Sequence, residues 1–276
     1  MEIENVTAGT FRYIMERWGF WYIGPGVLLV LTAWLSLYLL QYSTALTKFF
    51  LVLPFIWFFV GWMLAYSAAM QRFMKEFARE NNFDYYDSGS LEDVRGTLFE
   101  RGHSKDISHV VAGKQGDFPV RFFHYQFSVQ RGKEPSTYYF TVAEITLRGP
   151  VPHVLMESRG MFDFMSFRGK AHPAEVSLGE TFRRHFHVYT AKDFEIEAFE
   201  IFTPEVMEVL IEKAKGFDLE FVENRIYVFT RGIITRRSDM AKLLGLTKYL
   251  VVVLAPRLTR LHDDVAAHHA VRQKRN

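Results

Sequence analysis

The stretch that decides the fold covers residues 118–147 and reads FPVRFFHYQFSVQRGKEPSTYYFTVAEITL. Apolar side chains occupy alternate positions in both halves, which is the period of a strand with one buried face. These positions are Phe123, Tyr125, Phe127 and Val129 in the first half, and Tyr138, Phe140 and Val142 in the second. Residues 130–135 contain Gly132 and separate the two halves, so the pattern predicts an antiparallel hairpin.

Shorter strand patterns lie on both sides of this hairpin and predict that the sheet has more than two strands. They cover residues 107–112, 152–157, 185–189, 194–199, 217–223 and 225–229. Residues 160–173 show no period that assigns them to a helix or a strand. The predicted fold class is α+β, with an antiparallel sheet followed by C-terminal helices.

Two helices are predicted in the second half of the chain. Thr203 suits an N-cap, Pro204 suits the first helical position and Gly216 ends the apolar period. The apolar stretch Leu243–Ala255 is too short to span a membrane. It is therefore expected to form either a docked core helix or an interfacial helix.

Two long stretches near the amino end, residues 18–47 and 49–71, contain no Asp, Glu, Lys or Arg. A helix that spans a bilayer needs about 20 apolar residues. The pattern therefore predicts a transmembrane hairpin with helices near Phe20–Leu40 and Phe49–Ala69, in preference to two buried core helices or a cleaved signal peptide. Small residues at Gly61, Ala65 and Ala69 form a stripe that suits close packing of another helix.

Basic residues flank the predicted hairpin on its outer sides. The outer flanks carry Arg12, Arg17, Arg72, Lys75 and Arg79, whereas the connecting segment carries Lys48. Basic residues concentrate on the cytoplasmic side of membrane proteins. The sequence thus predicts a multi-pass protein of the cytoplasmic (inner) membrane, with both termini in the cytoplasm and the lipid bilayer as a partner.

The predicted organisation has five parts, and the second span is expected to continue as a helix up to Asn81–Asn82. The parts are a cytoplasmic N-terminal tail (1–18), the two-helix hairpin (19–71), a helical extension (72–82), an α+β soluble domain (83–238) and a C-terminal helical tail (239–276).

The composition of the 276-residue chain excludes several classes of protein. With 33 Lys and Arg against 31 Asp and Glu the net charge is +2, which argues against a dedicated nucleic-acid binder. The chain has no Cys, so it has no disulfide, no thiol nucleophile and no Cys-ligated metal.

The histidines suggest metal binding at two places, and in both the structural interpretation is favoured. His185 and His187 share one face of a predicted strand without a visible third ligand. The C-terminal cluster of His262, Asp263, Asp264, His268 and His269 points in several directions when it is wound into a helix. No metal ligand and no cofactor are predicted.

Catalytic signatures are equally weak. His103 and Ser104 are sequence neighbours, and neighbours seldom face one another as a nucleophile and its base must, so a turn is the better interpretation. Arg121 and Arg159 are expected to pair with Glu144 and Glu157 across strands, which would be a structural role. No catalytic residue is predicted.

The chain from about residue 49 resembles an uncharacterised family of bacterial two-span membrane proteins, a domain of unknown function. The shared features include Phe77-Ala-Arg, Asn82-Phe83-Asp-Tyr85, Gly113-x-x-Gly116, Thr137–Val142, Phe182–Tyr189 and Phe202-Thr-Pro-Glu205. These are packing and turn residues and imply no activity. Members are sometimes encoded near LemA-type membrane proteins, so the resemblance implies a membrane protein as a possible partner.

The functional prediction is a membrane-anchored, non-enzymatic protein whose cytoplasmic α+β domain binds another protein or a second copy of the chain. The alternative is a membrane-tethered, hydrolase-like enzyme whose site combines dispersed residues such as His103, His124, His153 or Glu144. A third possibility is a transporter or channel subunit that oligomerises through the small-residue stripe.

Overall fold

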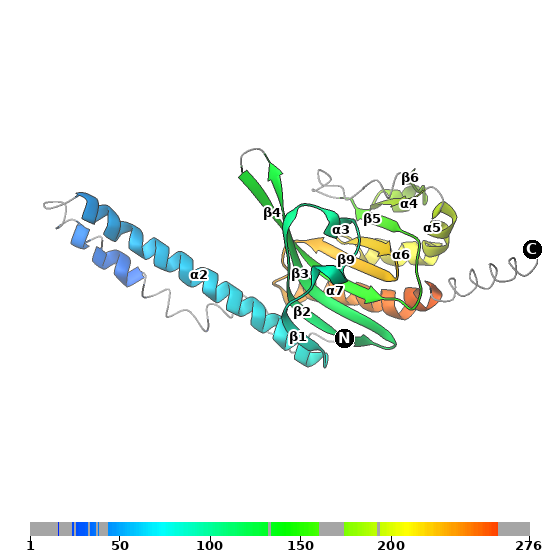
Figure 1. Cartoon of the computed structure of the whole chain (residues 1–276), viewed down its shortest axis with the longest axis horizontal. Helices are drawn as coiled ribbons and strands as arrows, with labels where there is room; N and C mark the ends of the chain where they lie inside the picture. The colour runs from blue at the N-terminus through cyan, green and yellow to red at the C-terminus, as the bar shows by residue number, and fades with distance from the viewer. Residues whose placement is uncertain are drawn as a thin grey trace, which may run out of the picture.

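The computed structural model describes residues 44–131, 134–159, 174–191 and 194–258, together with scattered positions between 16 and 38. Figure 1 shows a long helix that leads into a sheet with helices packed on it. The strands are β1 (Asp84–Ser88), β2 (His103–Gln115), β3 (Phe118–Arg131), β4 (Glu134–Thr146), β5 (Val154–Ser158), β6 (Ala174–Glu175), β7 (Phe186–Thr190), β8 (Asp218–Val222) and β9 (Arg225–Arg231). The helical elements are α2 (Thr44–Glu80), η1 (Leu91–Asp93), α3 (Thr97–Glu100), α4 (Glu180–Arg183), α5 (Glu195–Ile201), α6 (Pro204–Lys213), α7 (Arg237–Tyr249) and the π-helical turn η4 (Leu250–Leu254).

The described strands form one nine-stranded antiparallel sheet in the order β1-β2-β3-β4-β9-β8-β5-β7-β6. The β3–β4 hairpin, in register from Val120 opposite Ile145 to Arg131 opposite Glu134, confirms the hairpin predicted from residues 118–147. The β8–β9 hairpin lies between β4 and β5, so strands that come late in the chain connect the two halves of the sheet. The α+β class is correct.

Helices cover one face of the sheet, which we call the helix face. The end of α2 packs here through Phe77, which is fully buried and meets the ring of Phe122 edge-on at 5.3 Å. Helices α6 and α7 add Leu210 and Leu243 to the same core. Apolar side chains at a spacing of three and four residues give each helix one buried face, and this burial holds the helices on the sheet.

The opposite face carries a short strap, residues 89–102, which contains η1 and α3. Phe99 of the strap lies 4.9 Å from the ring of Tyr125 and 5.0 Å from the ring of Tyr227. Val94 and Leu98 are buried beside it in a second, smaller core. We call this side of the sheet the strap face.

The transmembrane prediction is wrong for the part of the chain that the structure describes. The predicted span Phe49–Ala69 lies within α2, a single helix of 37 residues that continues to the sheet. Among the described residues, no helix has both the length and the apolar character that crossing a bilayer requires. This finding overturns the two-helix hairpin in the fold class and the multi-pass inner-membrane localisation.

Part of the second stretch is used for packing within this chain, because α2 continues into the core that contains Met70, Phe73 and Phe77. Ala65 and Ala69 of the small-residue stripe are buried within this chain. Of the first predicted span, Phe20–Leu40, the described positions are 24, 26–32, 34–36 and 38, all of them helical, and the other positions lie outside the described residues.

The structure confirms some of the other predicted helices and strands and corrects one of them. Helix α2 ends at Glu80, immediately before the predicted stop, where Asn82 adopts a positive φ of 54°. Residues 194–199, predicted as a strand, fall mainly in helix α5. The stretch Leu243–Ala255 is a docked core helix that continues into η4. The C-terminal histidine cluster at 262–269 lies outside the described residues.

Candidate functional site

A row of polar side chains crosses the strap face through four adjacent strands. Paired positions of neighbouring strands share a face of the sheet, so side chains in register stand beside one another. From β3 to β8 the row is Arg121, Glu144, Tyr227 and Glu220. Three of its members are almost fully buried: Glu144 at 2% exposure, and Tyr227 and Glu220 at 0%. The row therefore places two carboxylates and a phenol in the interior of the protein.

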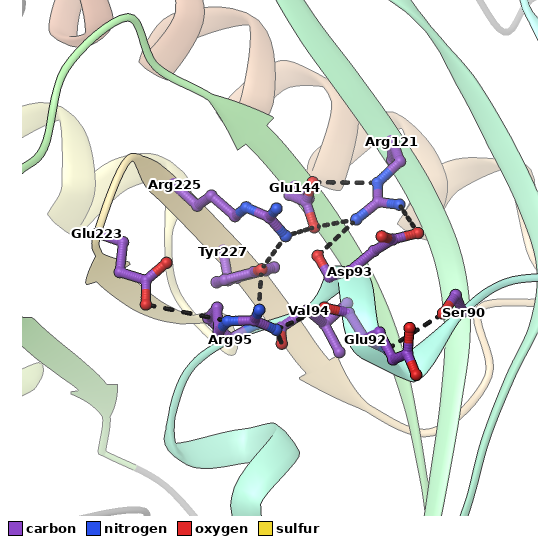
Figure 2. A network of polar contacts seen from close by, with 10 residues as sticks. All are labelled: Ser90, Glu92, Asp93, Val94, Arg95, Arg121, Glu144, Glu223, Arg225 and Tyr227. Carbon is purple, nitrogen blue, oxygen red and sulfur yellow. Dashed lines mark hydrogen bonds and ion pairs between the residues drawn. The ribbon is translucent and has the colours of Figure 1, made fainter.

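Glu144 forms the centre of one half of the row (Figure 2). Arg121 donates to both of its oxygens, with Nε to Oε1 at 3.0 Å and Nη2 to Oε2 at 2.7 Å. A second guanidinium, that of Arg225, lies 3.6 Å from Oε2. The bidentate geometry gives the stronger kind of charge-assisted bond. The predicted cross-strand pairing of Arg121 with Glu144 is confirmed.

Tyr227 occupies the middle of the row and uses its hydroxyl oxygen as an acceptor. The backbone N–H of Arg95 donates to it at 3.1 Å and Nη1 of Arg225 donates at 3.2 Å. Burial, together with the charge of Glu144, raises the pKa of Tyr227 to about 12. Burial alone would lower the pKa of Arg225, but the bond to Tyr227 and the charge of Glu144 raise it. The phenol therefore stays neutral and the guanidinium stays charged near neutral pH.

The same network ties the first half of the strap to the sheet. Arg121 donates from Nη2 to the Asp93 carbonyl at 3.3 Å, and its Nη1 lies 3.9 Å from the Asp93 carboxylate. Arg95 approaches Glu223 at 3.9 Å on the β8–β9 turn. Ser90 caps η1 by accepting from the Glu92 N–H at 3.1 Å. Figure 2 shows Arg121 linking Glu144 to Asp93 of the strap, Arg95 of the strap linked to Tyr227, and Ser90 and Glu223 at the margins of the network.

Glu220 holds the second half of the strap. Its carboxylate accepts from the Thr97 N–H at 2.8 Å, from Thr97 Oγ1 at 2.6 Å and from His153 Nε2 at 2.8 Å. The close approach requires glycine at position 96, where φ is +110° and a Cβ atom would lie 2.6 Å from Glu220 Oε2. Glu220 therefore anchors the first turn of α3 and orients His153.

The network can do two things chemically: immobilise the strap and orient one imidazole. Both buried carboxylates already accept bonds from specific donors, which is how buried charge is tolerated. The His153 side chain retains 24% exposure. Within the described ranges, no group of three or more His, Asp or Glu residues has a geometry that would hold a metal ion.

The residues of the predicted enzyme site do not converge. Glu144 and His153 contribute to the strap face, but His124 is buried on the helix face. His103 is exposed at the start of β2, where its Nδ1 lies 3.1 Å from the Ser104 hydroxyl. His187, considered as a metal ligand, pairs through Nδ1 with Glu175 at 2.8 Å. The dispersed residues therefore belong to separate structural contacts.

Sequence reasoning missed Glu220, Tyr227 and Thr97. Glu220 lies between Leu219 and Phe221 in a strand whose other residues are largely buried, and an acid in that position is the signal that was available. Its partner Thr97 lies 123 residues earlier in the chain. No local pattern connects the two.

The fold and the site together define an α+β protein with a nine-stranded antiparallel sheet, helices on one face and a strap held by a buried polar row on the other. No protein-family model matches the chain, and no curated protein matches it. A solved structure with similarity to this chain is the crystal structure of the mycobacterial trehalose monomycolate transport factor A, TtfA. The TM-score is 0.47 and the identity 14%, over 65% of this chain and 92% of that chain. The resemblance to the two-span family stays a prediction.

Proposed function

We propose that this chain is a non-enzymatic protein-binding module that uses the projecting part of α2 to bind an apolar helix of another protein. One observation carries the proposal: residues 55–60 of α2 are all apolar and all substantially exposed, from 48% at Phe58 to 63% at Phe59. Met63 and Leu64 continue the surface at 57% and 58%. Folded monomers rarely expose apolar surface over so long a contiguous stretch, and such surface is typical of interaction sites.

The geometry of α2 supports a helical partner. The helix projects away from the sheet (Figure 1), and its exposed apolar side chains at residues 55–60 occupy successive positions and so point to several sides of the helix. A second helix can follow such a rod along several turns. Complete burial of each large apolar side chain contributes about 1.5–3 kcal/mol.

The polar row supports a binding role over a catalytic one. Glu144 and Glu220 are occupied by Arg121, Thr97 and His153, and the bond from Thr97 to Glu220 fastens the strap to the sheet. A rigid strap and sheet give a stable base from which α2 projects.

Site-specific photo-crosslinking in the native cell tests the proposal. A photoreactive phenylalanine analogue at Phe59 is expected to give one discrete adduct with another protein, whereas the analogue at the exposed Glu208 of α6 gives none. Ile56→Asp should abolish the adduct because it places a charge in the contact. The matched control Ile196→Asp changes an equally apolar residue, 74% exposed on α5, and should leave the adduct intact. Equal labelling from the analogues at Phe59 and Glu208 would refute the proposal. An adduct with twice the 32.3 kDa mass of the chain would show that the partner is a second copy of this chain and not another protein.

The alternative function, a hydrolase-like enzyme, is favoured by one observation. His153 is partly exposed and lies 2.8 Å from a buried carboxylate, an arrangement that can orient a general base. Purified protein would then hydrolyse an activated ester such as p-nitrophenyl acetate. His153→Asn should lower that rate by about 100-fold or more, whereas His185→Asn should not. Equal rates in both variants would exclude this function.

A further inference from the structure

A basic pocket lies on the last turns of α2, away from the apolar surface assigned to protein binding. It has a volume of about 370 Å³, far more than the roughly 30 Å³ that one water molecule occupies. Its lining residues recur every three or four positions and so share one face of the helix. They are Ala68, Gln71, Arg72, Lys75, Glu76 and Arg79.

The lining has an excess of two positive charges. Glu76 is taken by Arg72, whose Nε lies 2.6 Å from its carboxylate one turn away. Lys75 lies 5.0 Å above the ring of Tyr85, and within the described residues neither Lys75 nor Arg79 has a carboxylate within ion-pair distance. The helix dipole accounts for a basic residue in the last turn, such as Arg79. It does not account for the basic residues Arg72 and Lys75 in the earlier turns or for the pocket that the three side chains line.

We propose that this pocket binds a phosphate group, with Lys75 and Arg79 as its principal cationic ligands and Gln71 beside them. A phosphate dianion matches the excess of two positive charges, and its several oxygens can accept bonds from a guanidinium and an ammonium at once. The phosphate can be free or carried by a phosphate monoester, or it can belong to a phospholipid headgroup. A headgroup phosphodiester carries one negative charge instead of two, but its non-bridging oxygens accept bonds from the same cationic side chains. The site is independent of the protein-binding function, since it uses other residues of α2.

One lining residue, Gln71, connects to the half-buried His109 and through it to the buried His124, which provides a reporter of occupancy. Gln71 Nε2 donates to Asp87 Oδ1 at 2.9 Å, and the Tyr85 hydroxyl lies 3.0 Å from the same oxygen and 2.7 Å from His109 Nδ1. The ring of His109 meets that of His124 edge-on at 5.5 Å. The chain of contacts therefore runs from the pocket lining into the sheet.

The charges around His109 fix the direction of the response. Burial lowers the pKa of His109, Lys75 lowers it further, and Asp87 and Asp106 oppose these effects. The other neighbour, His124, is neutral near pH 7 because burial lowers its pKa to about 3. A phosphate beside Lys75 offsets the ammonium charge, so occupancy should raise the pKa of His109.

The test titrates inorganic phosphate into the full-length protein and follows the imidazole resonances of His109 by NMR, with sodium chloride at matched ionic strength as the reference. Phosphate should raise the His109 pKa and saturate. Lys75→Gln and Arg79→Gln should each weaken the apparent affinity about fivefold or more, the effect of losing about 1 kcal/mol. The controls Lys242→Gln and Arg148→Gln remove the same charges from exposed remote sites and should bind as the wild type does.

A second arm separates the two sources of phosphate. Vesicles of phosphatidylglycerol, compared with vesicles of phosphatidylcholine, are sedimented with each variant. Binding of inorganic phosphate that depends on Lys75 and Arg79 supports a soluble ligand. Retention that needs phosphatidylglycerol and both residues, with no response to inorganic phosphate, supports a lipid headgroup. The proposal is overturned if the double variant K75Q/R79Q responds like the wild type in both arms, or if neither probe binds.

Discussion

Replacing Glu220 by alanine is expected to destabilise the protein by about 4 kcal/mol. The substitution leaves the Thr97 N–H and hydroxyl without an acceptor, and Thr97 is 6% exposed. A buried donor left unpaired costs about 1–3 kcal/mol. His153 loses its bond too, but its partly exposed ring can turn to water and adds little. The cavity left by the side chain contributes the remainder.

Urea unfolding followed by circular dichroism measures the effect. At an m-value of roughly 2.5 kcal/mol/M the midpoint should fall by about 1.5 M. Glu220→Gln should cost less, since the amide keeps one acceptor oxygen for Thr97 and the hydroxyl and imidazole can accept from its NH₂. The control Glu208→Ala, exposed on α6, should change the stability by less than about 0.5 kcal/mol.

A double-mutant cycle with Thr97→Val tests the assignment of partners. On its own this substitution should cost about 1 kcal/mol, and in the Glu220→Ala background it should cost almost nothing. The reasoning fails if Glu220→Ala costs less than about 1 kcal/mol. It also fails if Thr97→Val has the same cost in both backgrounds, because the two side chains would then not be coupled.

Three further predictions concern backbone space at two glycines and acid stability. Gly245→Ala, at an exposed position within α7 where an added Cβ meets nothing within 4 Å, should raise the free energy of unfolding by about 0.5–1 kcal/mol. Gly113→Ala should lower it by about 1–3 kcal/mol because the new Cβ would overlap the ring of Phe83, and equal midpoints in thermal unfolding would contradict both expectations. His124 has a folded-state pKa of about 3 against an ordinary value of 6.5, so the unfolded chain takes up a proton first and stability falls as the pH drops through this window. His124→Leu should therefore make the free energy of unfolding, measured by urea unfolding between pH 4 and 6, less dependent on pH by up to about 1.4 kcal/mol per pH unit.

Local patterns predicted the parts of the fold that depend on near neighbours. The β3–β4 hairpin follows from alternation on both sides of a glycine-containing turn, and its register brings Arg121 opposite Glu144 as expected. The end of α2 before Asn82 and the start of α6 at Pro204 follow from residues that stop or begin helices. Each of these signals is contained within a few residues of the feature that it predicts.

The failures came where tertiary context decides. Six alternating residues at 194–199 suit either a strand or one face of a helix, and packing of Ala198 and Ile201 on the sheet selects the helix. The charge-free stretch that contains Tyr66 predicts a membrane span, but it is part of α2, whose last turns pack in the core on the sheet. The Glu220–Thr97 contact was beyond reach because it depends on which strands become neighbours.

The strand order has a consequence for synthesis on the ribosome. Within the described residues, strands β4 and β5 are joined through β9 and β8, the two described strands that come latest in the sequence. A nascent chain that has emerged as far as residue 190 therefore holds two separate part-sheets, each with an unpaired edge awaiting the same hairpin. Bare strand edges recruit other chains, so chaperone dependence should be greatest over the interval in which residues 191–231 are translated.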